Sequence, residues 1–386
     1  MGFSGFGSVA RICVDDVSAL GGYGMKSNQP KYMQLKQEIL RWLKEGKLKP
    51  DEKLPTEYEL AEMFSISRHT VRQAIGEMVH EGYLYRVQGS GTFVKGQKGR
   101  EEGEKTIGLV TTYISDYIFP SIIRGAEAYL RNKGYRLLLS STDNDKDKER
   151  ESLERMAEYR LSGLIIEPTK SAEPNRNLDH YLSLEFQGIP YLMINAKYPE
   201  LDCASVRIDD EKGAFLATEH LIRLGHRHIA GFFKTDDLQG VERMKGYFRA
   251  HKQYGIPVLP ELVVRYTTEQ KWTFPREAAV RLLAAENAPT ALFCYNDELA
   301  VHLLDVIREQ GKKIPQDLSM ASFDDSSLAT ATETKLTTIV HPKAKLGEKA
   351  AQILLEMIEG KWEGRAPTIV FEPELIVRDS TGEPRL

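Results

Sequence analysis

Cysteine is scarce in this chain of 386 residues, which contains only Cys13, Cys203 and Cys294. The three lie far apart, so they cannot all pair with one another and do not have the spacing of a metal site. This excludes a disulfide framework and a cysteine-based zinc module. We therefore expect a reducing, cytoplasmic compartment and no bound metal.

Long apolar stretches are also missing, because no run approaches the roughly 18 residues of a membrane span. The first 24 residues are rich in Gly and Ser, and Asp15 and Asp16 interrupt the one mildly apolar stretch. A signal peptide needs a basic start and an unbroken apolar core, so a transport-type binding protein is disfavoured. We expect residues 1–29 to be a disordered extension, with Met25 as one candidate for the natural start.

A strong excess of one charge is absent as well, since the formal net charge is −4. The distribution is nevertheless uneven. Residues 31–98 hold 12 Lys and Arg against 9 Asp and Glu, a balance of +3, and the rest of the chain holds 40 against 47, a balance of −7. A small basic module on an acidic body is consistent with local contact to nucleic acid, whose phosphates are met by Lys and Arg.

The chain is predicted to divide at residues 96–105, which contain no apolar residue and several glycines and are typical of a solvated linker. Residues 30–95 before it form one expected domain, and residues 106–386 after it form another. Length is consistent with this division, because 386 residues are long for a single domain.

The first expected domain carries three helix signals and a hairpin. Apolar residues recur at helical spacing across residues 32–43, and Thr56–Glu59 has the form of a capping box. Ser67 is placed to cap a third helix that ends at Gly82. Residues 83–94 then read as two short strands around a Gly-containing turn.

The second expected domain alternates strand-like and helix-like segments. The strand candidates are residues 107–111, 136–140, 163–167, 190–194, 228–233, 291–294 and 319–323. Amphipathic helices lie between them, for example at residues 121–133, 212–224 and 299–310. Repeated strand–helix units with nearly continuous apolar strands predict an α/β fold with a parallel sheet covered on both faces. Because the strands are too numerous for one such sheet, we expect two subdomains.

A helix-turn-helix is predicted because only Ser65–Ser67 separates the second helix from the third. The third helix should lie in a major groove, with its N-terminal residues facing base edges. Arg68 and Arg72 share one helical face, so we expect them to reach guanine edges or phosphates, beside His69 and Thr70. A solvated face is the alternative for an arbitrary pair of arginines. Their position at the start of the third helix favours DNA.

The tip of the predicted hairpin holds Gln88 and Gly89, where Gly lets the backbone approach a surface closely. Both a minor-groove contact and a plain turn are compatible with this position.

Three segments of residues 30–94 closely resemble the GntR-family winged helix: Lys53-Leu-Pro-Thr-Glu-Tyr-Glu-Leu-Ala, Ser67-Arg-His-Thr-Val-Arg-Gln-Ala and Gly89-Ser-Gly-Thr-Phe-Val. The resemblance implies that Arg68 and Arg72 contact DNA from the recognition helix and that Gln88 and Gly89 form the wing tip. Many members have Arg where this chain has Tyr58. Lys31, at the start of the first helix, is expected to replace some of that phosphate affinity.

Residues 106–378 resemble the LacI/GalR effector domain, whose two-subdomain fold is similar to periplasmic sugar-binding proteins. The motifs that carry the resemblance occur in order: Glu219-His-Leu-Ile-Arg-Leu-Gly-His-Arg-His-Ile-Ala, Arg243-Met-Lys-Gly-Tyr, Pro289-Thr-Ala-Leu-Phe-Cys-Tyr-Asn-Asp-Glu-Leu-Ala and Ser322-Phe-Asp-Asp. The expected architecture is therefore a winged helix-turn-helix followed by a periplasmic-binding-protein-like α/β domain.

A sugar site needs paired hydrogen-bond donors and acceptors in a cleft, and open α/β sheets bind ligands beyond the carboxyl ends of their strands. Polar residues that end the predicted strands are therefore candidates for binding the effector: Glu167, Asn195, Asn296 and Asp324. The resemblance places all four, and Arg243, at ligand-facing positions. For Asn296 and Asp324 the alternative is a helix cap, and for Arg243 it is a surface cation.

Three further effector candidates come from loops. The resemblance places Asp116 and Phe119, after the first strand, where that family contacts its ligand. His341 follows Thr338-Ile-Val in a crossover region near the same cleft. Phe119 as a core residue and His341 as a satisfied structural histidine are the alternatives. Trp272 is a further aromatic candidate outside this set.

The union of these two domain types, together with Thr111-Thr-Tyr-Ile-Ser-Asp, resembles the repressors of arabinose operons in Gram-positive bacteria. This resemblance implies L-arabinose as the releasing ligand, double-stranded operator DNA as a partner and a homodimer as the assembly. The residues themselves indicate only a small polar ligand, and other pentoses stay open.

An enzyme is the rival from another class. GntR-type heads also occur on aminotransferase-like bodies, which use a lysine Schiff base to a cofactor, but such a body would not carry the ordered motifs above. The chain also lacks the G-x-x-x-x-G-K-[ST] loop of a kinase. We therefore expect no catalytic residues and no cofactor.

Overall fold

The computed structural model of the chain describes residues 30–49, 51–80, 82–87, 89–95, 105–362 and 366–385. The predicted extension over residues 1–29, most of the predicted linker and Gln88 lie outside the described residues. The chain divides into two compact units, residues 1–99 and residues 100–386. None of the helices in the described ranges combines the length and the apolar composition that crossing a bilayer requires.

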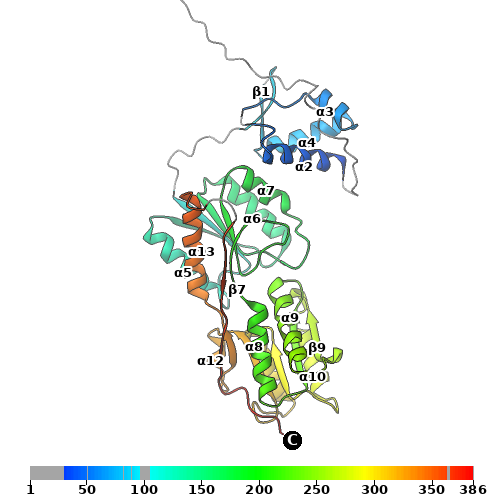
Figure 1. Cartoon of the computed structure of the whole chain (residues 1–386), viewed down its shortest axis with the longest axis vertical. Coiled ribbons are helices and arrows are strands. Elements are labelled where there is room, and N and C mark those ends of the chain that lie inside the picture. The colour runs from blue at the N-terminus through cyan, green and yellow to red at the C-terminus, as the bar shows by residue number, and fades with distance from the viewer. Residues whose placement is uncertain are drawn as a thin grey trace, which may run out of the picture. The chain divides into compact units, whose positions relative to one another are not determined.

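The N-terminal unit contains the three predicted helices and the predicted hairpin (Figure 1). The elements are α2 (Lys31–Lys44), α3 (Glu57–Met63), α4 (Arg68–His80), β1 (Leu84–Val87) and β2 (Gly91–Val94). The two strands are antiparallel. Leu60 of α3 and Val71 and Ile75 of α4 have at most 1% of their surface exposed, so α4 turns an apolar stripe toward the core of this unit.

Local capping explains where α3 and α4 begin. The Thr56 hydroxyl accepts a hydrogen bond from the Glu59 backbone N–H at 3.3 Å, and the Glu59 carboxylate accepts one from the Thr56 N–H at 2.6 Å. The Ser67 hydroxyl accepts one from the Thr70 N–H at 3.1 Å. Each cap satisfies a backbone donor that a helix start leaves unpaired, so both predicted helix starts are confirmed.

The C-terminal unit contains two six-stranded sheets, one in each of two lobes, as predicted (Figure 1). The first lobe has the strand order β13-β7-β6-β5-β3-β4 and is parallel throughout. Its strands are β3 (Thr106–Thr111), β4 (Arg136–Ser141), β5 (Gly163–Ile166), β6 (Tyr191–Ile194), β7 (Ala204–Ile208) and β13 (Thr368–Phe371). Its helices are α5 (Phe119–Asn132), α6 (Lys146–Glu158), α7 (Leu178–Phe186) and α13 (Lys343–Ile358).

The second lobe has the strand order β14-β12-β11-β10-β8-β9, in which only the edge strand β14 is antiparallel to its neighbour. Its strands are β8 (Ile229–Lys234), β9 (Val263–Tyr266), β10 (Ala291–Cys294), β11 (Ser319–Asp324), β12 (Thr337–Val340) and β14 (Glu374–Ile376). Its helices are α8 (Asp210–Arg223), α9 (Leu238–Gln253), α10 (Phe274–Leu283), α11 (Asp297–Glu309) and α12 (Leu328–Ala331), with 3-10 turns at Pro260–Leu262 and Thr268–Gln270.

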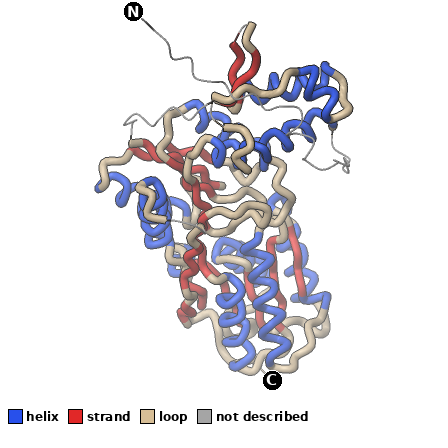
Figure 2. Tube along the Cα trace, turned by 45° about the horizontal axis from the view of Figure 1, so that its top comes forward, coloured by secondary structure: helices blue, strands red, loops and turns tan. Residues whose placement is uncertain are grey.

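Helices cover both faces of each sheet, which is why the central strands are apolar at nearly every position. Figure 2 shows this for the second lobe, where helices flank the strands on both sides. Each lobe has two apolar cores, one on each face of its sheet. In the first lobe α5 and α13 pack so closely that a Cβ on Gly347 would lie 2.0 Å from the Ile122 carbonyl oxygen, so only glycine fits there.

The chain passes between the two lobes three times, after β7, after β12 and after β13. The carboxyl ends of the parallel strands in both sheets lie next to these crossovers. Ligands of open α/β sheets bind at such strand ends, so this fold places a site between the lobes.

Candidate functional site

The start of α4 presents an exposed basic face. Arg68 and His69 are exposed, and the Arg72 side chain is 59% exposed. The Arg72 guanidinium donates to the Glu57 carboxylate of α3, with Nη2 to Oε2 at 2.9 Å and Nε to Oε2 at 3.2 Å. Thr70 is half-buried, and its hydroxyl lies 2.8 Å from that of Ser67.

Glu57 holds the arginines of this surface near one another. The hydrogen bond from Arg72 lowers the pKa of Glu57, and the charges of Arg86 and Arg68 act in the same direction against partial burial. Arg86 Nη2 lies 3.8 Å from Glu57 Oε1, a contact that sequence reasoning missed. An exposed ion pair adds little stability, so Arg72 is free to exchange this carboxylate for a phosphate or a base.

The other predicted DNA contacts are also at the surface. Lys31, the first residue of α2, is exposed, and so is Gly89 in the turn between β1 and β2, with φ +74°. Tyr58, which stands where many GntR proteins have Arg, is 65% exposed. Gln88 lies outside the described residues.

A cavity of about 120 Å³ lies between the two lobes of the C-terminal unit. A single water needs roughly 10–15 Å³ of such space, so the cavity is large enough for one small molecule. All eight predicted effector residues line it: Asp116, Phe119, Glu167, Asn195, Arg243, Asn296, Asp324 and His341. Asp116 is exposed at the rim, and Phe119 both lines the cavity and packs against the core of the first lobe.

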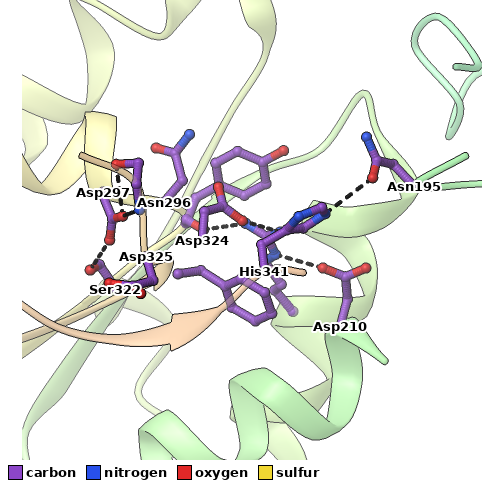
Figure 3. A network of polar contacts seen from close by, with 12 residues as sticks. Asn195, Asp210, Asn296, Asp297, Ser322, Asp324, Asp325 and His341 are labelled. Carbon is purple, nitrogen blue, oxygen red and sulfur yellow. Dashed lines mark hydrogen bonds and ion pairs between the residues drawn. The ribbon is translucent and has the colours of Figure 1, made fainter. Parts of the chain in front are cut away.

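The strand ends explain this convergence. Glu167 directly follows β5, Asn195 directly follows β6, Asn296 comes shortly after β10, and Asp324 is the last residue of β11. In Figure 3, Asn195 lies on one side of His341 and Asp324, and Asn296 lies on the other. The two parallel sheets thus bring residues that are far apart in sequence to one cleft.

Glu167 is a buried carboxylate whose geometry is fixed by its neighbours. Its Oε2 accepts hydrogen bonds from the Thr111 hydroxyl at 3.0 Å, the Thr112 hydroxyl at 2.6 Å and the Thr112 N–H at 2.9 Å. Its Oε1 accepts one from Asn195 Nδ2 at 2.7 Å. These donors compensate the buried charge and leave Oε1 able to accept one further hydrogen bond from a ligand.

The protonation of His341 follows from the same chain of contacts. A carboxylate only accepts, so Asn195 must turn its amide nitrogen to Glu167 and its oxygen to His341. His341 Nε2 therefore donates to Asn195 Oδ1, at 3.1 Å. Nδ1 is then an unprotonated acceptor, and it is buried without a partner among the residues that the structure describes. His341 is thus only half satisfied, and it offers an acceptor to a ligand hydroxyl.

Arg243 occupies the second lobe's side of the cavity and is 3% exposed, so the surface-cation alternative is wrong. Its Nε donates to Asp210 Oδ1 at 2.9 Å, its Nη2 to Asp324 Oδ1 at 3.1 Å and its Nη1 to the Tyr295 carbonyl at 2.6 Å. The guanidinium has five N–H donors. Three of them donate to groups in the described part of the chain, which leaves one on each terminal nitrogen for a ligand.

Burial raises the pKa of Asp210 to about 7, against the opposing charge of Arg243. One guanidinium therefore stands between two buried carboxylates, those of Asp210 and Asp324. In Figure 3, Asn296 lies on one side of His341 and Asp210 lies on the other.

The helix-cap alternative holds for Asn296 but not for Asp324. Asn296 does cap α11, because its Oδ1 accepts from the Leu299 N–H at 2.9 Å. Its amide nitrogen has no hydrogen-bond partner among the residues that the structure describes, so it remains available to a ligand. Asp324 caps no helix, since Ser327 precedes α12, and the cap alternative is wrong for it.

Several residues of the cavity were missed by sequence reasoning, and most come from loops. They are Tyr113, Tyr117, Asp210, Lys234, Lys271, Tyr295 and Glu298. Trp272, the further aromatic candidate, also lines the cavity, and Lys271 Nζ lies 4.3 Å from the centroid of its ring. Tyr117 of the first lobe donates its hydroxyl to Asp324 Oδ2 at 2.8 Å. Its left-handed backbone, φ +57°, gives no signal in sequence.

The buried His341 leads to a prediction about stability and pH. Burial lowers its pKa from 6.5 to about 4, so in the folded chain it stays neutral while in the unfolded chain it takes up a proton. The stability that the neutral His341 gives to the folded state is therefore fully present above pH 6.5, and it is lost as the pH falls toward 4. Between pH 7.5 and 5 we expect the wild type to lose about 2 kcal/mol more unfolding free energy than a His341→Gln variant.

Chemical unfolding of the full chain at the two pH values measures this difference. The raised pKa of Asp210 has the opposite effect, because it increases the unfolding free energy as the pH falls. This effect is present in the wild type and in the variant, so it cancels when their losses are compared. Equal losses in the wild type and the variant would show that His341 titrates normally.

No group of three or more His, Cys, Asp or Glu side chains in the described part of the chain is arranged to hold a metal ion. The cavity itself is lined by hydrogen-bonding groups from both lobes, with aromatic rings beside them.

Comparison with known proteins agrees with this geometry. Residues 31–94 match the gntR family of bacterial regulatory proteins, and residues 218–381 match the periplasmic binding protein-like domain. A solved LacI family transcriptional regulator from Enterococcus faecium, with bound ribose, is 29% identical with a TM-score of 0.62, covering 73% of this chain and all of that one.

Two relatives match along nearly the whole chain. The arabinose metabolism transcriptional repressor of Geobacillus stearothermophilus is 60% identical over 357 residues, 92% of this chain and 98% of its own length. The repressor of the same name from Halalkalibacterium halodurans is 47% identical over 366 residues, 92% of this chain and 97% of its own length. The chain therefore belongs to the family of arabinose metabolism transcriptional repressors, sugar-responsive regulators that join a GntR-type winged helix to a LacI-type domain.

Proposed function

We propose that this repressor binds L-arabinose in the cavity between its lobes and that the sugar releases it from operator DNA. The observation that carries the proposal is the set of unused hydrogen-bonding groups in the cavity. Arg243 and Asn296 offer donors from the second lobe, and Glu167 Oε1 and His341 Nδ1 offer acceptors from the first lobe and the crossover. A sugar hydroxyl both donates and accepts, so it satisfies both kinds of group.

The charges of the cavity favour a neutral ligand. Arg243 is balanced by two carboxylates, Lys234 Nζ lies 3.0 Å from Asp237 Oδ2, and Lys271 Nζ lies 3.4 Å from Glu298 Oε2. Each of these three cations thus has a carboxylate partner, which weakens the attraction for an anionic ligand. Trp272 and Phe119 supply apolar surface of the kind that packs against the C–H groups of a sugar ring. The eight predicted effector residues would then contact the sugar from both lobes.

L-Arabinose is favoured among sugars because the two relatives that match nearly the whole chain carry arabinose in their names. D-Ribose is the second candidate, since the Enterococcus faecium regulator holds ribose in the same fold. In either case the protein acts as a regulator without turnover, in the cytoplasm, where the operator lies.

For the operator we propose that α4 enters a major groove and that the hairpin tip reaches the adjacent minor groove. Arg68, His69, Arg72 and Thr70 would lie at base edges and phosphates, Lys31 at a phosphate, and Gln88 and Gly89 at the wing tip. Two chains, paired through their C-terminal units, would place two such heads on half-sites related by two-fold symmetry.

Saturating L-arabinose is expected to weaken operator binding by about 5- to 150-fold, the usual range for coupling between two sites. The reason is that the sugar binds the closed cleft more tightly, and the closed form presents the heads in an arrangement that no longer fits both half-sites. Fluorescence anisotropy of a labelled operator duplex at fixed salt measures the effect. D-Ribose and D-galactose serve as parallel titrants, and unchanged binding in saturating L-arabinose would reject the proposal.

A further inference from the structure

We propose that residues Lys170–Ala172, called here the cross-lobe loop, hold the cleft closed by joining its two lobes, with Ser171 as a positioning residue for the sugar response. Ser171 does not line the cavity, so it acts without touching the sugar. The proposal rests on the proposed function in one respect, namely that L-arabinose favours the closed cleft.

The central contact joins the first lobe to helix α9 of the second. Ser171 Oγ accepts a hydrogen bond from the Leu238 backbone N–H at 2.9 Å, and the Ala172 N–H donates to the Asp236 carbonyl at 3.3 Å. Leu238 is the first residue of α9, so its N–H has no acceptor inside its own helix. The first lobe thus caps the helix on which Arg243 reaches the cavity.

Burial makes this cap effective. Ser171 is 1% exposed, so water does not compete for the bond while the lobes are together. When the lobes part, the Leu238 N–H and the Ser171 hydroxyl return to water and the bond is lost. The contact therefore stabilises the closed form only.

A second set of contacts flanks the first. Lys170 Nζ lies 2.5 Å from Glu269 Oε1, and Asn144 Nδ2 donates to Thr268 Oγ1 at 2.7 Å, both from the first lobe to the second. The Asn144 oxygen accepts from the Lys170 N–H at 2.9 Å, which ties the two pairs together. The Glu269 side chain is 62% exposed, so this ion pair is weaker than the buried cap.

The cross-lobe loop is rigidly attached to its own lobe. The Thr169 N–H donates to the fully buried Glu149 carboxylate at 3.3 Å, and the Thr169 carbonyl accepts from the Tyr198 hydroxyl at 2.7 Å. Lys170 has the left-handed φ of +40°, which costs energy for any side chain and persists only where the surroundings impose it. Because the loop is fixed to its own lobe, its contacts with the second lobe hold the two lobes together.

Closure and sugar affinity are linked quantitatively. When only the closed form binds, the measured Kd equals the closed-state Kd divided by the fraction of closed molecules. Ser171→Ala removes one buried hydrogen bond that exists only in the closed form. We expect this variant to bind L-arabinose about 3- to 10-fold more weakly, chiefly through faster dissociation.

The test compares full-length wild type, Ser171→Ala and Ser152→Ala by calorimetric titration and stopped-flow binding of L-arabinose. Ser152 is the matched control, because it is also buried in the first lobe but its hydroxyl pairs with Ser140 of the same lobe, at 2.8 Å. Only Ser171→Ala should dissociate faster, while operator affinity without sugar stays that of the wild type. Equal sugar affinity in Ser171→Ala and the wild type would overturn the inference.

A charge exchange keeps the test independent of folding defects. Lys170→Glu and Glu269→Lys should each weaken L-arabinose binding about 2- to 5-fold, and the double variant should recover most of the loss. Additive losses in the double variant would contradict the cross-lobe role. If the wild type itself does not bind L-arabinose, the proposed function fails, and that outcome is distinct from either result above.

Discussion

Replacing Arg68 and Arg72 together with alanine is expected to lower operator affinity by roughly 100-fold to 10⁴-fold, because each arginine contact to a base edge contributes about 10- to 100-fold in affinity. Both side chains stand at the exposed start of α4, which caps and packing hold in place. The apolar stripe of this helix is on its other face, so the substitutions leave the core of the N-terminal unit intact. Anisotropy of a labelled operator at fixed salt measures the loss.

The control is an equal change of charge away from α4. Arg131 and Arg155 are exposed arginines of the first lobe, each beside a glutamate one turn earlier in its helix, and the Arg131→Ala, Arg155→Ala double variant should bind the operator like the wild type. Arg72→Lys separates charge from geometry, since lysine keeps the charge but lacks the planar fork. It should retain the salt dependence and lose base discrimination. Wild-type affinity in the Arg68, Arg72 double variant would refute the assignment of α4 as the recognition helix.

The N-terminal unit was predictable because its determinants are local. Thr56 and Ser67 each mark the start of a helix in the sequence. Each accepts a hydrogen bond from the backbone N–H three residues later, as a helix cap requires. The apolar spacing of α4 fixes its buried face in the same way. What the pattern did not contain is the pairing of Arg72 with Glu57, because that contact joins two helices across the turn.

In the C-terminal unit, sequence reasoning found even the four-residue strands β5, β6 and β10, because all of their residues are buried and nearly all are apolar. The strands that it left out, such as β9, β12 and β14, are as short or shorter, and each contains a polar or charged residue. A short run that is interrupted in this way shows neither a continuous apolar stretch nor a period. The crossover after β12 was nevertheless anticipated, and it carries His341 to the cavity as expected.

The cavity was predictable to the extent that it follows from strand ends. Glu167, Asn195 and Asp324 come directly at the ends of buried strands. In a parallel sheet the carboxyl ends of the strands lie at the same edge, so these residues come together there. Tyr117 and Asp210 had no such signal. Tyr117 depends on a left-handed backbone in a loop, and Asp210 starts α8 just after a crossover, where its acidic side chain looks like an ordinary helix-start residue.

Loss of Arg243 is expected to abolish the response to L-arabinose, leaving a repressor that sugar no longer removes from the operator. Arg243→Ala deletes the two N–H donors that Arg243 offers to a ligand and leaves Asp210 and Asp324 without their common partner. Removing one member of a buried ion pair costs about 3–5 kcal/mol of stability. Calorimetric titration with L-arabinose and operator anisotropy in saturating sugar measure the two effects.

Arg249→Ala is the matched control, since Arg249 lies on the same helix but is half exposed and pairs with Glu211. It should keep both sugar binding and release. Arg243→Lys controls for a loss of sugar binding that results from misfolding, because it keeps one cation between the two carboxylates. A single ammonium cannot reproduce the fork to Asp210, Asp324 and the Tyr295 carbonyl, so sugar affinity should still fall by about 10- to 100-fold. Wild-type release of Arg243→Ala by L-arabinose would contradict the assignment of this cavity.

The penalty in Arg243→Ala should itself depend on pH. Burial already raises the pKa of Asp210 to about 7 while Arg243 opposes it, so deleting the guanidinium raises that pKa further. The carboxyl group then takes up a proton and its buried charge disappears. For a carboxyl whose pKa is raised by folding, stability is retained at low pH and lost as the pH rises through the folded-state value. The unfolding free energy lost in Arg243→Ala should therefore be smaller at pH 5.5 than at pH 8. A penalty equal at both pH values would mean that Asp210 is not the group left unpaired.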